Sequence, residues 1–238
     1  MKNLITYLLK LGFWFLAIIF MVSCSSSNEN QQGRRKKIVK DVDTTQIINN
    51  DTKFVFTETE SIHKNTINES EIEYYDLDTE KSILTWFCVT HTGYVKFKEG
   101  RVGVVKGEIV SANFEICMDS IADTDIDYML MREVLVNTLK SPDFFDIGKF
   151  PTSTFSLSHL KKEKGSFYQA AGDLRIRDIT HQINFKSTIV KNDSLMMMIS
   201  ERFSIDRTLW DITIYSENYE QTDDSFLFTD MVEFQVSL

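Results

Sequence analysis

Few side chains in this sequence have the type and spacing that catalysis or metal binding requires. The four histidines, His63, His91, His159 and His181, form neither a His-x-His pair nor an H-E-x-x-H motif. The sequence also has no G-x-S-x-G nucleophile, no cysteine with an evident histidine base and no glycine-rich phosphate loop. We therefore predict no catalytic residues and no metal ligands, and we do not expect an enzyme.

Two polar positions could still contact the headgroup of a ligand. His91 could point inward and hydrogen-bond a ligand, or it could be tied to the backbone. Asp206 and Arg207 are neighbours on a predicted strand, so only one of them can point inward. An inward charge must be paired, so Arg207 is expected to meet either Asp230 or a ligand headgroup. If the protein processed a bound lipid, His91 and Asp206 would be its acid–base candidates.

Large apolar side chains are more informative than the polar ones. Aromatic rings and methionines adapt to irregular shapes without polar demands, so they suit a flexible hydrocarbon ligand. The same residues could equally fill a solid core, and the residues alone favour the core. The candidate lining residues are Trp86, Phe87, Phe97, Phe114, Phe155, Phe185, Phe203 and Trp210, joined by Met196, Met197 and Met198.

These side chains must be positioned by β-strands, because apolar residues alternate along most of the chain from residue 83 onward. Tyr168, Ala170, Gly172, Leu174 and Ile176 share one face, and Leu195, Met197, Ile199, Phe203 and Ile205 share another. Strands are predicted near residues 83–89, 93–104, 108–118, 150–160, 168–177, 183–189, 195–205 and 226–238, with a helix near residues 123–141.

The turns between these strands indicate antiparallel neighbours. Lys106-Gly107 and Lys164-Gly165 are short turn sequences typical of hairpins. Eight antiparallel strands can close into a barrel that holds side chains or one small ligand. A two-sheet sandwich fits the same periodicity, so the pattern alone leaves both architectures open.

The N-terminal segment looks like the signal peptide of a bacterial lipoprotein. Residues 1–23 hold Lys2, Lys10 and an apolar run that is too short to span a membrane comfortably. The run ends in Ser23-Cys24, which resembles a lipobox, so Cys24 is the predicted lipidation site and first mature residue. Residues 24–72 are mostly polar and are predicted to form a tether. We expect lipid anchoring to a bacterial membrane in the cell envelope, facing the periplasm by default.

Charge and cysteine content narrow the function further. Removing residues 1–23, which contain two lysines and no acid, takes the formal charge from −9 to −11. A surface this acidic argues against nucleic acid as a partner. With Cys24 lipidated, Cys88 and Cys117 remain, and the sequence leaves open whether they form a disulfide or stay free.

Several separated segments carry a resemblance to a known family. Pro142 ends the predicted helix, Asp143 and Asp146 favour a turn, and Phe144 and Phe145 can plug one end of a core. The other segments are Ser82–Trp86, His91–Gly93, Asp119–Ile121, Gly172–His181, Phe203–Trp210, which reads as a late strand, and a closing strand after Asp230. Together they resemble the YceI-like family of secreted, lipocalin-like barrels that bind polyisoprenoid or other long-chain lipids. Asp178 and Asp211 depart from that pattern at turn positions where glycine or asparagine is usual, so those two loops are expected to differ.

The resemblance implies an all-β fold: an eight-stranded antiparallel lipocalin-like barrel over residues 73–238, with one helix inserted between strands. The resemblance also favours a lipid-filled interior over the solid core that the residues alone favour. The implied ligand is a long-chain isoprenoid lipid, such as an isoprenoid quinone or a polyprenyl lipid, and no other cofactor is expected. The implied ligand-binding residues are Trp86, His91, Phe97, Phe114, Phe155, Phe185, Phe203, Arg207 and Trp210. The alternative is a structural or interaction barrel with a filled core, and pairing of barrels into a homodimer stays open.

Overall fold

The computed structural model describes residues 69–89, 91–192, 194–216 and 229–238. The predicted signal peptide, Cys24 and the predicted tether up to residue 68 lie outside these ranges, so those assignments stay predictions. No helix within the described residues is long and apolar enough to cross a membrane.

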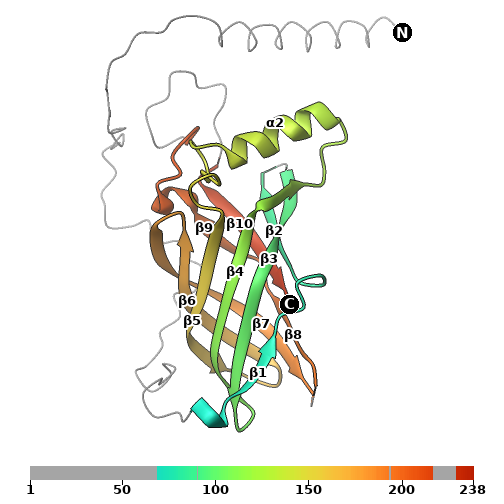
Figure 1. Ribbon diagram of the computed structural model, residues 1–238, viewed down its shortest axis with the longest axis vertical. Coiled ribbons are helices and arrows are strands. Elements are labelled where there is room, and N and C mark those ends of the chain that lie inside the picture. The colour runs from blue at the N-terminus through green and yellow to red at the C-terminus, as the bar shows by residue number, and fades with distance from the viewer. Residues whose placement is uncertain (1–68, 90, 193, 217–228) are drawn as a thin grey trace, which may run out of the picture. The chain divides into compact units, whose positions relative to one another are not determined.

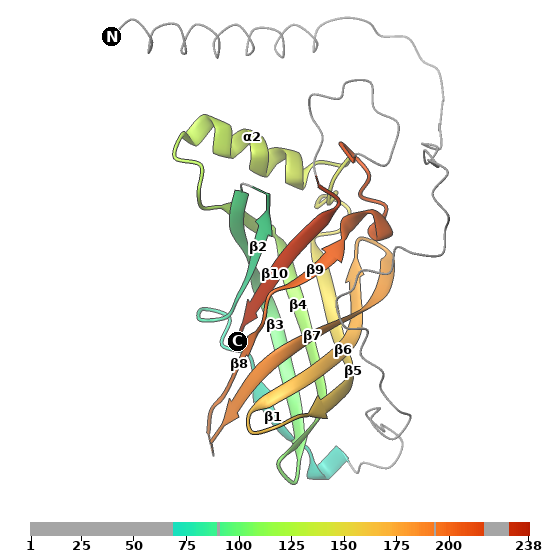
Figure 2. The same ribbon diagram turned by 180° about the vertical axis from the view of Figure 1, so that it is seen from behind.

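The described residues form a closed antiparallel barrel with eight strand positions, as predicted (Figures 1 and 2). Around the barrel, each strand pairs with the next and β3 pairs with β4 to close the ring. The strands are β2 (Ile83–Cys88), β3 (His91–Val105), β4 (Glu108–Asp123), β5 (Thr152–Lys162), β6 (Phe167–Ile176), β7 (Ile179–Lys191), β8 (Met196–Ser200), β9 (Phe203–Asp206) and β10 (Met231–Ser237). A short helix, η4 (Glu69–Glu71), precedes β1 (Glu73–Asp76). β1 pairs antiparallel with residues 101–104 of β3.

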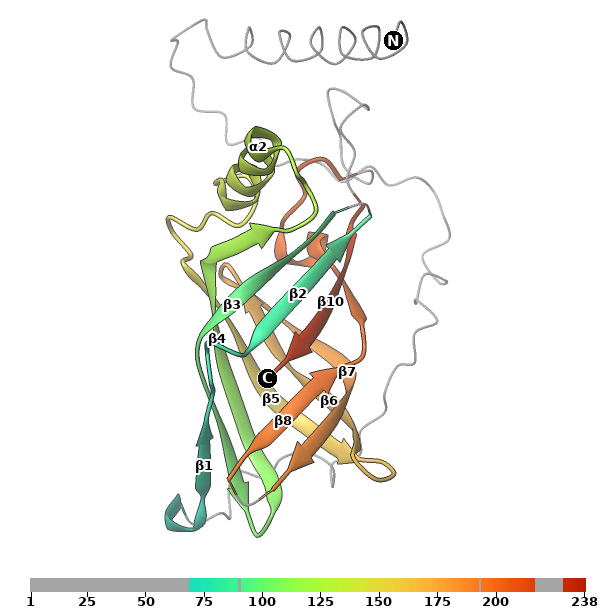
Figure 3. The same ribbon diagram turned by 90° about the vertical axis from the view of Figure 1, so that its right-hand side faces the viewer.

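The inserted helix, α2 (Met129–Lys140), lies between β4 and β5, as predicted. It begins later than residue 123 because β4 continues to Asp123, which pairs with Gly93 of β3. It ends before Pro142, since the preceding Ser141 takes an extended conformation, with ψ 162°. In Figure 3, α2 lies across one end of the barrel, opposite the β3–β4 hairpin.

The tight turns take the backbone conformations that their residues permit. Lys106 and Gly107 both have positive φ, 50° and 88°, as a two-residue hairpin turn requires. Asp211 has φ 58°, a left-handed conformation that aspartate tolerates better than most residues. In the β6–β7 hairpin the positive φ falls on Arg177, at 55°, rather than on Asp178.

The predicted seventh strand is broken, which corrects its inward face. Glu201 and Arg202 separate β8 from β9, and the side-chain alternation shifts by one residue across this break. Met198, Phe203 and Ile205 therefore face the interior, whereas Met197 is 52% exposed. Leu195 and Ile199 are also exposed, so the single face predicted for this segment was wrong.

The late strand predicted through Trp210 also ends early, at Asp206. The Asp206 carboxylate accepts hydrogen bonds from Thr208 N, at 2.9 Å, and from Thr208 Oγ1, at 2.6 Å. This cap starts a short 3-10 helix, η5 (Arg207–Trp210), because it satisfies an otherwise free backbone donor. The Oδ1 atom of Asp206 is therefore engaged in a structural cap.

Gly93 is required where β3 passes Trp86 of β2. The two residues are register partners, and a methyl group on Gly93 would overlap the Trp86 ring and the carbonyl oxygen of Ala122. Neither the backbone of Ala122 nor the buried Trp86 ring can easily move aside. Gly93→Ala is therefore expected to destabilise the barrel by about 1–3 kcal/mol. Urea unfolding followed by circular dichroism measures this, with Gly148→Ala as the control because Gly148 faces open space. Equal midpoints for the two variants would contradict the packing role of Gly93.

Candidate functional site: the barrel interior

The barrel encloses an apolar cavity of about 170 Å³. Every barrel strand from β2 to β10 contributes to its wall, and α2 contributes Leu135, Thr138 and Leu139 at one end. The lining is apolar except for His91, Thr138, Ser153, Arg207 and Thr229. An apolar void of about 150 Å³ is large enough to bind a benzene ring. The interior is therefore neither a solid core nor an empty tunnel.

Eight of the nine predicted ligand-binding residues line this cavity. They are Trp86, His91, Phe97, Phe114, Phe155, Phe185, Phe203 and Arg207. Trp210 does not line it, because η5 packs its ring into the buried core cluster that also holds Leu174 and Ile212. Its Nε1 donates to the Leu174 carbonyl at 3.2 Å, and its ring meets His181 edge-on. Trp210 therefore anchors η5 to β6.

The phenylalanine rings form a continuous strip along one side of the cavity. Phe185 stacks on Phe203 with ring centroids 4.9 Å apart, and it also contacts Phe155 at 5.8 Å. Phe203 continues the strip to Phe234 at 6.1 Å. The ring of Phe155 lies over Gly172, where any side chain would overlap it. These contacts link β5, β7, β9 and β10 through their inward residues.

Sequence reasoning missed a large part of the wall. Pro142 and the turn after it place Phe144 and Phe145 against the cavity, as expected of a plug, and their rings pack edge to face at 5.1 Å. Further wall residues that were not among the predicted ligand-binding residues include Leu84, Val95, Ile116, Met118, Ile121, Leu135, Leu139, Leu174, Ile176, Ile183, Ile205, Ile212, Val232, Phe234, Val236 and Leu238. Alternation of Ile116 with Met118 and the four-residue spacing of Leu135 and Leu139 carried part of that signal. Of the three predicted methionines, Met198 lines the cavity and Met196 and Met197 do not. Phe87 does not line it either, and its ring lies against the Arg202 guanidinium.

Arg207 lies in the cavity wall, and the protein itself satisfies its guanidinium. Nη1 donates to the carbonyls of Ile212 and Ile214 at 2.9 and 2.8 Å, and Nε donates to Thr229 O at 3.1 Å. Nη2 lies 3.3 Å from Asp230 Oδ1, which is the ion pair expected as one alternative. Burial lowers the pKa of Arg207, and Asp230 opposes that shift. Arg207 is thus a buried, charged residue whose hydrogen bonds and ion pair connect the segments at the end of the barrel.

Both described cysteines are free thiols, which decides between the two alternatives that the sequence left open. Cys88 lines the cavity, and burial raises the pKa of its thiol although Arg207 acts to lower it. A raised pKa reduces the thiolate fraction, and the thiolate is the reactive form. Cys88 is therefore expected to react slowly with alkylating reagents at neutral pH.

This reactivity can be measured on the Cys117→Ser variant by mass spectrometry of peptides containing Cys88. Alkylation of Cys88 is expected to speed up about tenfold for each pH unit until the thiol is ionised. A bound ligand is expected to slow the reaction further. The Cys88→Ser variant is the control for labelling at other cysteines, and rapid labelling of Cys88 at neutral pH would contradict its burial.

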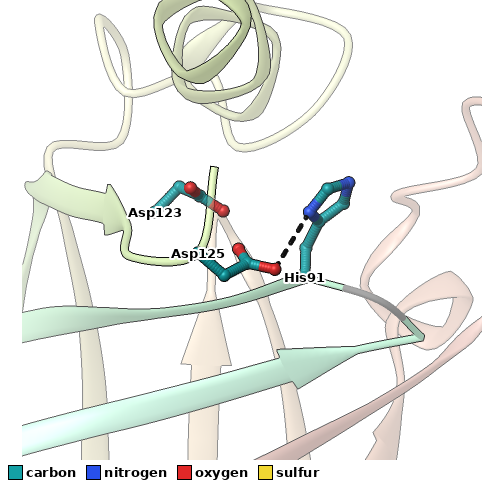
Figure 4. A group of neighbouring side chains, drawn as sticks. All are labelled: His91, Asp123 and Asp125. Carbon is teal, nitrogen blue, oxygen red and sulfur yellow. Dashed lines mark ion pairs between the residues drawn. The ribbon is translucent and has the colours of Figure 1, made fainter. Parts of the chain in front are cut away.

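His91 lies at the end of the cavity below α2, at the first residue of β3. Its Nδ1 is 3.4 Å from Asp125 Oδ2, and Asp123 lies beside them (Figure 4). The side chain thus touches the cavity and also meets two carboxylates outside the strip of aromatic rings.

Comparison with known proteins agrees with this geometry. A family model described as "YceI-like domain" matches residues 75–238. The crystal structure of Burkholderia cenocepacia BcnA is similar, with a TM-score of 0.55 and 20% identity, over 68% of this chain and 97% of that chain. A crystal structure of a Campylobacter jejuni YCEI protein gives a TM-score of 0.43 at 15% identity, over 79% of this chain and 96% of that chain. A search of curated proteins gives no match. At this identity the likeness to BcnA shows a shared fold.

Proposed function

This chain belongs to the YceI-like domain family of ligand-binding barrels, and from that premise we propose that it binds an isoprenoid or other long-chain amphiphilic lipid. The observation that carries the proposal is the cavity, to whose predominantly apolar wall all eight strand positions contribute. A hydrocarbon chain needs no polar partners, and burying each methylene contributes about 0.8 kcal/mol. Six methylenes would contribute roughly 5 kcal/mol, enough for a thousandfold gain in affinity.

The size of the cavity sets a condition on this binding. A volume of about 170 Å³ admits a ring-sized group but not a long chain, so lining side chains must move for the whole ligand to enter. Phe144, Phe145, Leu135 and Leu139 lie at the α2 end and belong to the connection between β4 and β5 rather than to the barrel ladder. We place the entrance there, because these residues can shift without breaking strand pairing.

The outer side of α2 supports loading from a membrane. Met129, Leu130 and Val134 are exposed, although Leu135 and Leu139 face the cavity, so the helix carries apolar residues on both sides. An apolar helix face can enter the interfacial region of a bilayer. We propose that Cys24 is lipidated and holds the barrel beside such a bilayer in the cell envelope, as a carrier or store.

Exchanging apolar for polar side chains on this helix should slow loading. The double variant Leu130→Gln and Val134→Gln is expected to take up a quinone from liposomes about tenfold more slowly, because each change removes more than 1 kcal/mol of apolar burial. Equilibrium occupancy should stay unchanged, since neither residue lines the cavity. Stopped-flow fluorescence with a quenching quinone measures the rate, and unchanged uptake would remove α2 from the loading step.

The proposed function is tested by what the protein carries. The full-length protein is purified in a detergent that contains no isoprenoid, extracted with organic solvent and analysed by mass spectrometry. About one lipid per chain is expected, and the emptied protein should bind an added isoprenoid quinone. An interior that stays empty under both conditions would overturn the proposal. That outcome would favour the structural barrel, which the stacked rings of Phe185, Phe203 and Phe234 and the small cavity already support in part.

A further inference from the structure

A cluster of three metal-ligating side chains lies at the α2 end of the barrel. One ligand atom each from His91, Asp123 and Asp125 lie within 4.8 Å of one another. Figure 4 shows the three side chains close together: His91 comes from β3, Asp123 from the end of β4 and Asp125 from the segment that follows β4. These residues are 32 to 34 positions apart in sequence, and the pairing of Gly93 with Asp123 brings them together. Local spacing could not reveal such a site.

The hydrogen bonds leave one oxygen of each carboxylate directed into the cluster. Asp123 Oδ1 accepts from Ile126 N at 2.9 Å, and Asp125 Oδ1 accepts from Thr92 N at 3.2 Å. These bonds fix the orientation of both carboxylates. The second oxygen of Asp123, Oδ2, has no hydrogen-bond partner among the described residues, although this side chain is only 4% exposed. A buried carboxylate oxygen without a donor is costly, which points to a missing partner.

His91 shows the same incomplete bonding. Its Nδ1 is 3.4 Å from Asp125 Oδ2, yet the geometry makes no hydrogen bond, and within the described chain this nitrogen has no other partner. Two ligand atoms at about 2.0–2.1 Å from a tetrahedral zinc ion lie roughly 3.3 Å apart. The separation of nitrogen and oxygen therefore fits two ligands of one cation better than it fits a direct hydrogen bond.

The two carboxylates of the cluster also favour a bound cation. In the part of the chain that the structure describes, neither carboxylate is ion-paired with a lysine or arginine. A divalent ion would balance the negative charges of these two neighbouring carboxylates.

We propose that His91 Nδ1 and one oxygen each of Asp123 and Asp125 bind a divalent first-row transition ion of the Zn²⁺ type. A neutral imidazole with two carboxylates is a ligand set that suits Zn²⁺, whereas Ca²⁺ and Mg²⁺ prefer oxygen-only shells of six or more ligands. Three protein ligands leave a fourth position open. His91 also lines the cavity, so the ion lies beside the entrance, and its binding needs no lipid.

The test is a titration of the lipid-extracted, full-length protein with ZnCl₂ by isothermal calorimetry. One equivalent is expected to bind. Asp125→Asn and His91→Gln are each expected to weaken binding at least about tenfold, because even the loss of a residue that merely orients a ligand costs 10- to 100-fold. The matched controls, Asp127→Asn and His159→Gln, lie outside the cluster and should bind as the parent does.

Two further measurements make the outcome decisive. X-ray absorption at the zinc edge should show nitrogen and oxygen ligands near about 2.0–2.1 Å, with the signature of one imidazole. Circular dichroism establishes whether each variant is folded. If the other variants do not fold, Asp123→Asn replaces them, because asparagine keeps the oxygen that accepts from Ile126 N. Zinc binding that is equal in the parent, Asp125→Asn and His91→Gln would overturn the proposal, as would an absence of stoichiometric binding. Neither result would bear on lipid occupancy, which is measured separately.

Discussion

Replacing Asp230 by alanine is expected to destabilise the barrel by about 3–5 kcal/mol, because it leaves the buried guanidinium of Arg207 without its counter-charge. Arg207 is only 4% exposed, so water cannot replace the lost carboxylate without opening the fold. The variant also removes the acceptor of Ser216 Oγ, which bonds Asp230 Oδ2 at 2.8 Å. Chemical denaturation followed by tryptophan fluorescence measures the free energy of unfolding.

The expected loss is large because this pair joins three segments. Arg207 starts η5, its Nη1 holds the carbonyls of Ile212 and Ile214, and Asp230 precedes β10. A double-mutant cycle with Arg207→Met separates the pair from its surroundings. If the two charges act together, the double variant should be more stable than Asp230→Ala, since it carries no unpaired buried charge. Additive effects of the two changes would contradict that coupling.

The strands could be predicted from sequence because their signals are local, whereas the choice of a barrel over a two-sheet sandwich came from the family resemblance. Alternation of Gly172, Leu174 and Ile176 with Asp173 and Arg175 fixes the two faces of this part of β6 without knowledge of any partner strand. Pro142 fixes the end of α2 in the same way. The break between β8 and β9 had a local signal that was not used: Glu201 and Arg202 are adjacent, so they cannot both face outward from one continuous strand.

The site features that could not be predicted depend on contacts between segments that are distant in sequence. Trp210 was predicted to line the cavity as one of the large aromatic side chains of a late strand, but the cap by Asp206 starts a 3-10 helix that packs the ring against β6. The cluster of His91, Asp123 and Asp125 depends on the register of β3 against β4. No local pattern encodes that register. The size of the cavity likewise depends on how the rings of Phe185 and Phe203 stack.

Filling the cavity through β7 should abolish lipid binding. Ile183 lines the cavity from the middle of this strand, and a tryptophan there would occupy space that a ligand needs. Occupancy at a fixed lipid concentration is expected to fall at least about tenfold, since displacing two buried methylenes already costs about 1.6 kcal/mol. Overpacking should also cost about 1–3 kcal/mol of stability, which an intact barrel tolerates. Mass spectrometry of extracted lipid and titration with an isoprenoid quinone measure the loss.

The same strand supplies the control. Val190 is exposed on the outer face of β7, so Val190→Trp adds the same ring without entering the cavity. It should keep the lipid occupancy of the parent, and circular dichroism should show both variants folded. Equal occupancy in Ile183→Trp and Val190→Trp would mean that the ligand binds elsewhere on the protein. Loss in Ile183→Trp alone would place the hydrocarbon chain between β7 and the strip of aromatic rings, because no other part of the wall would have changed.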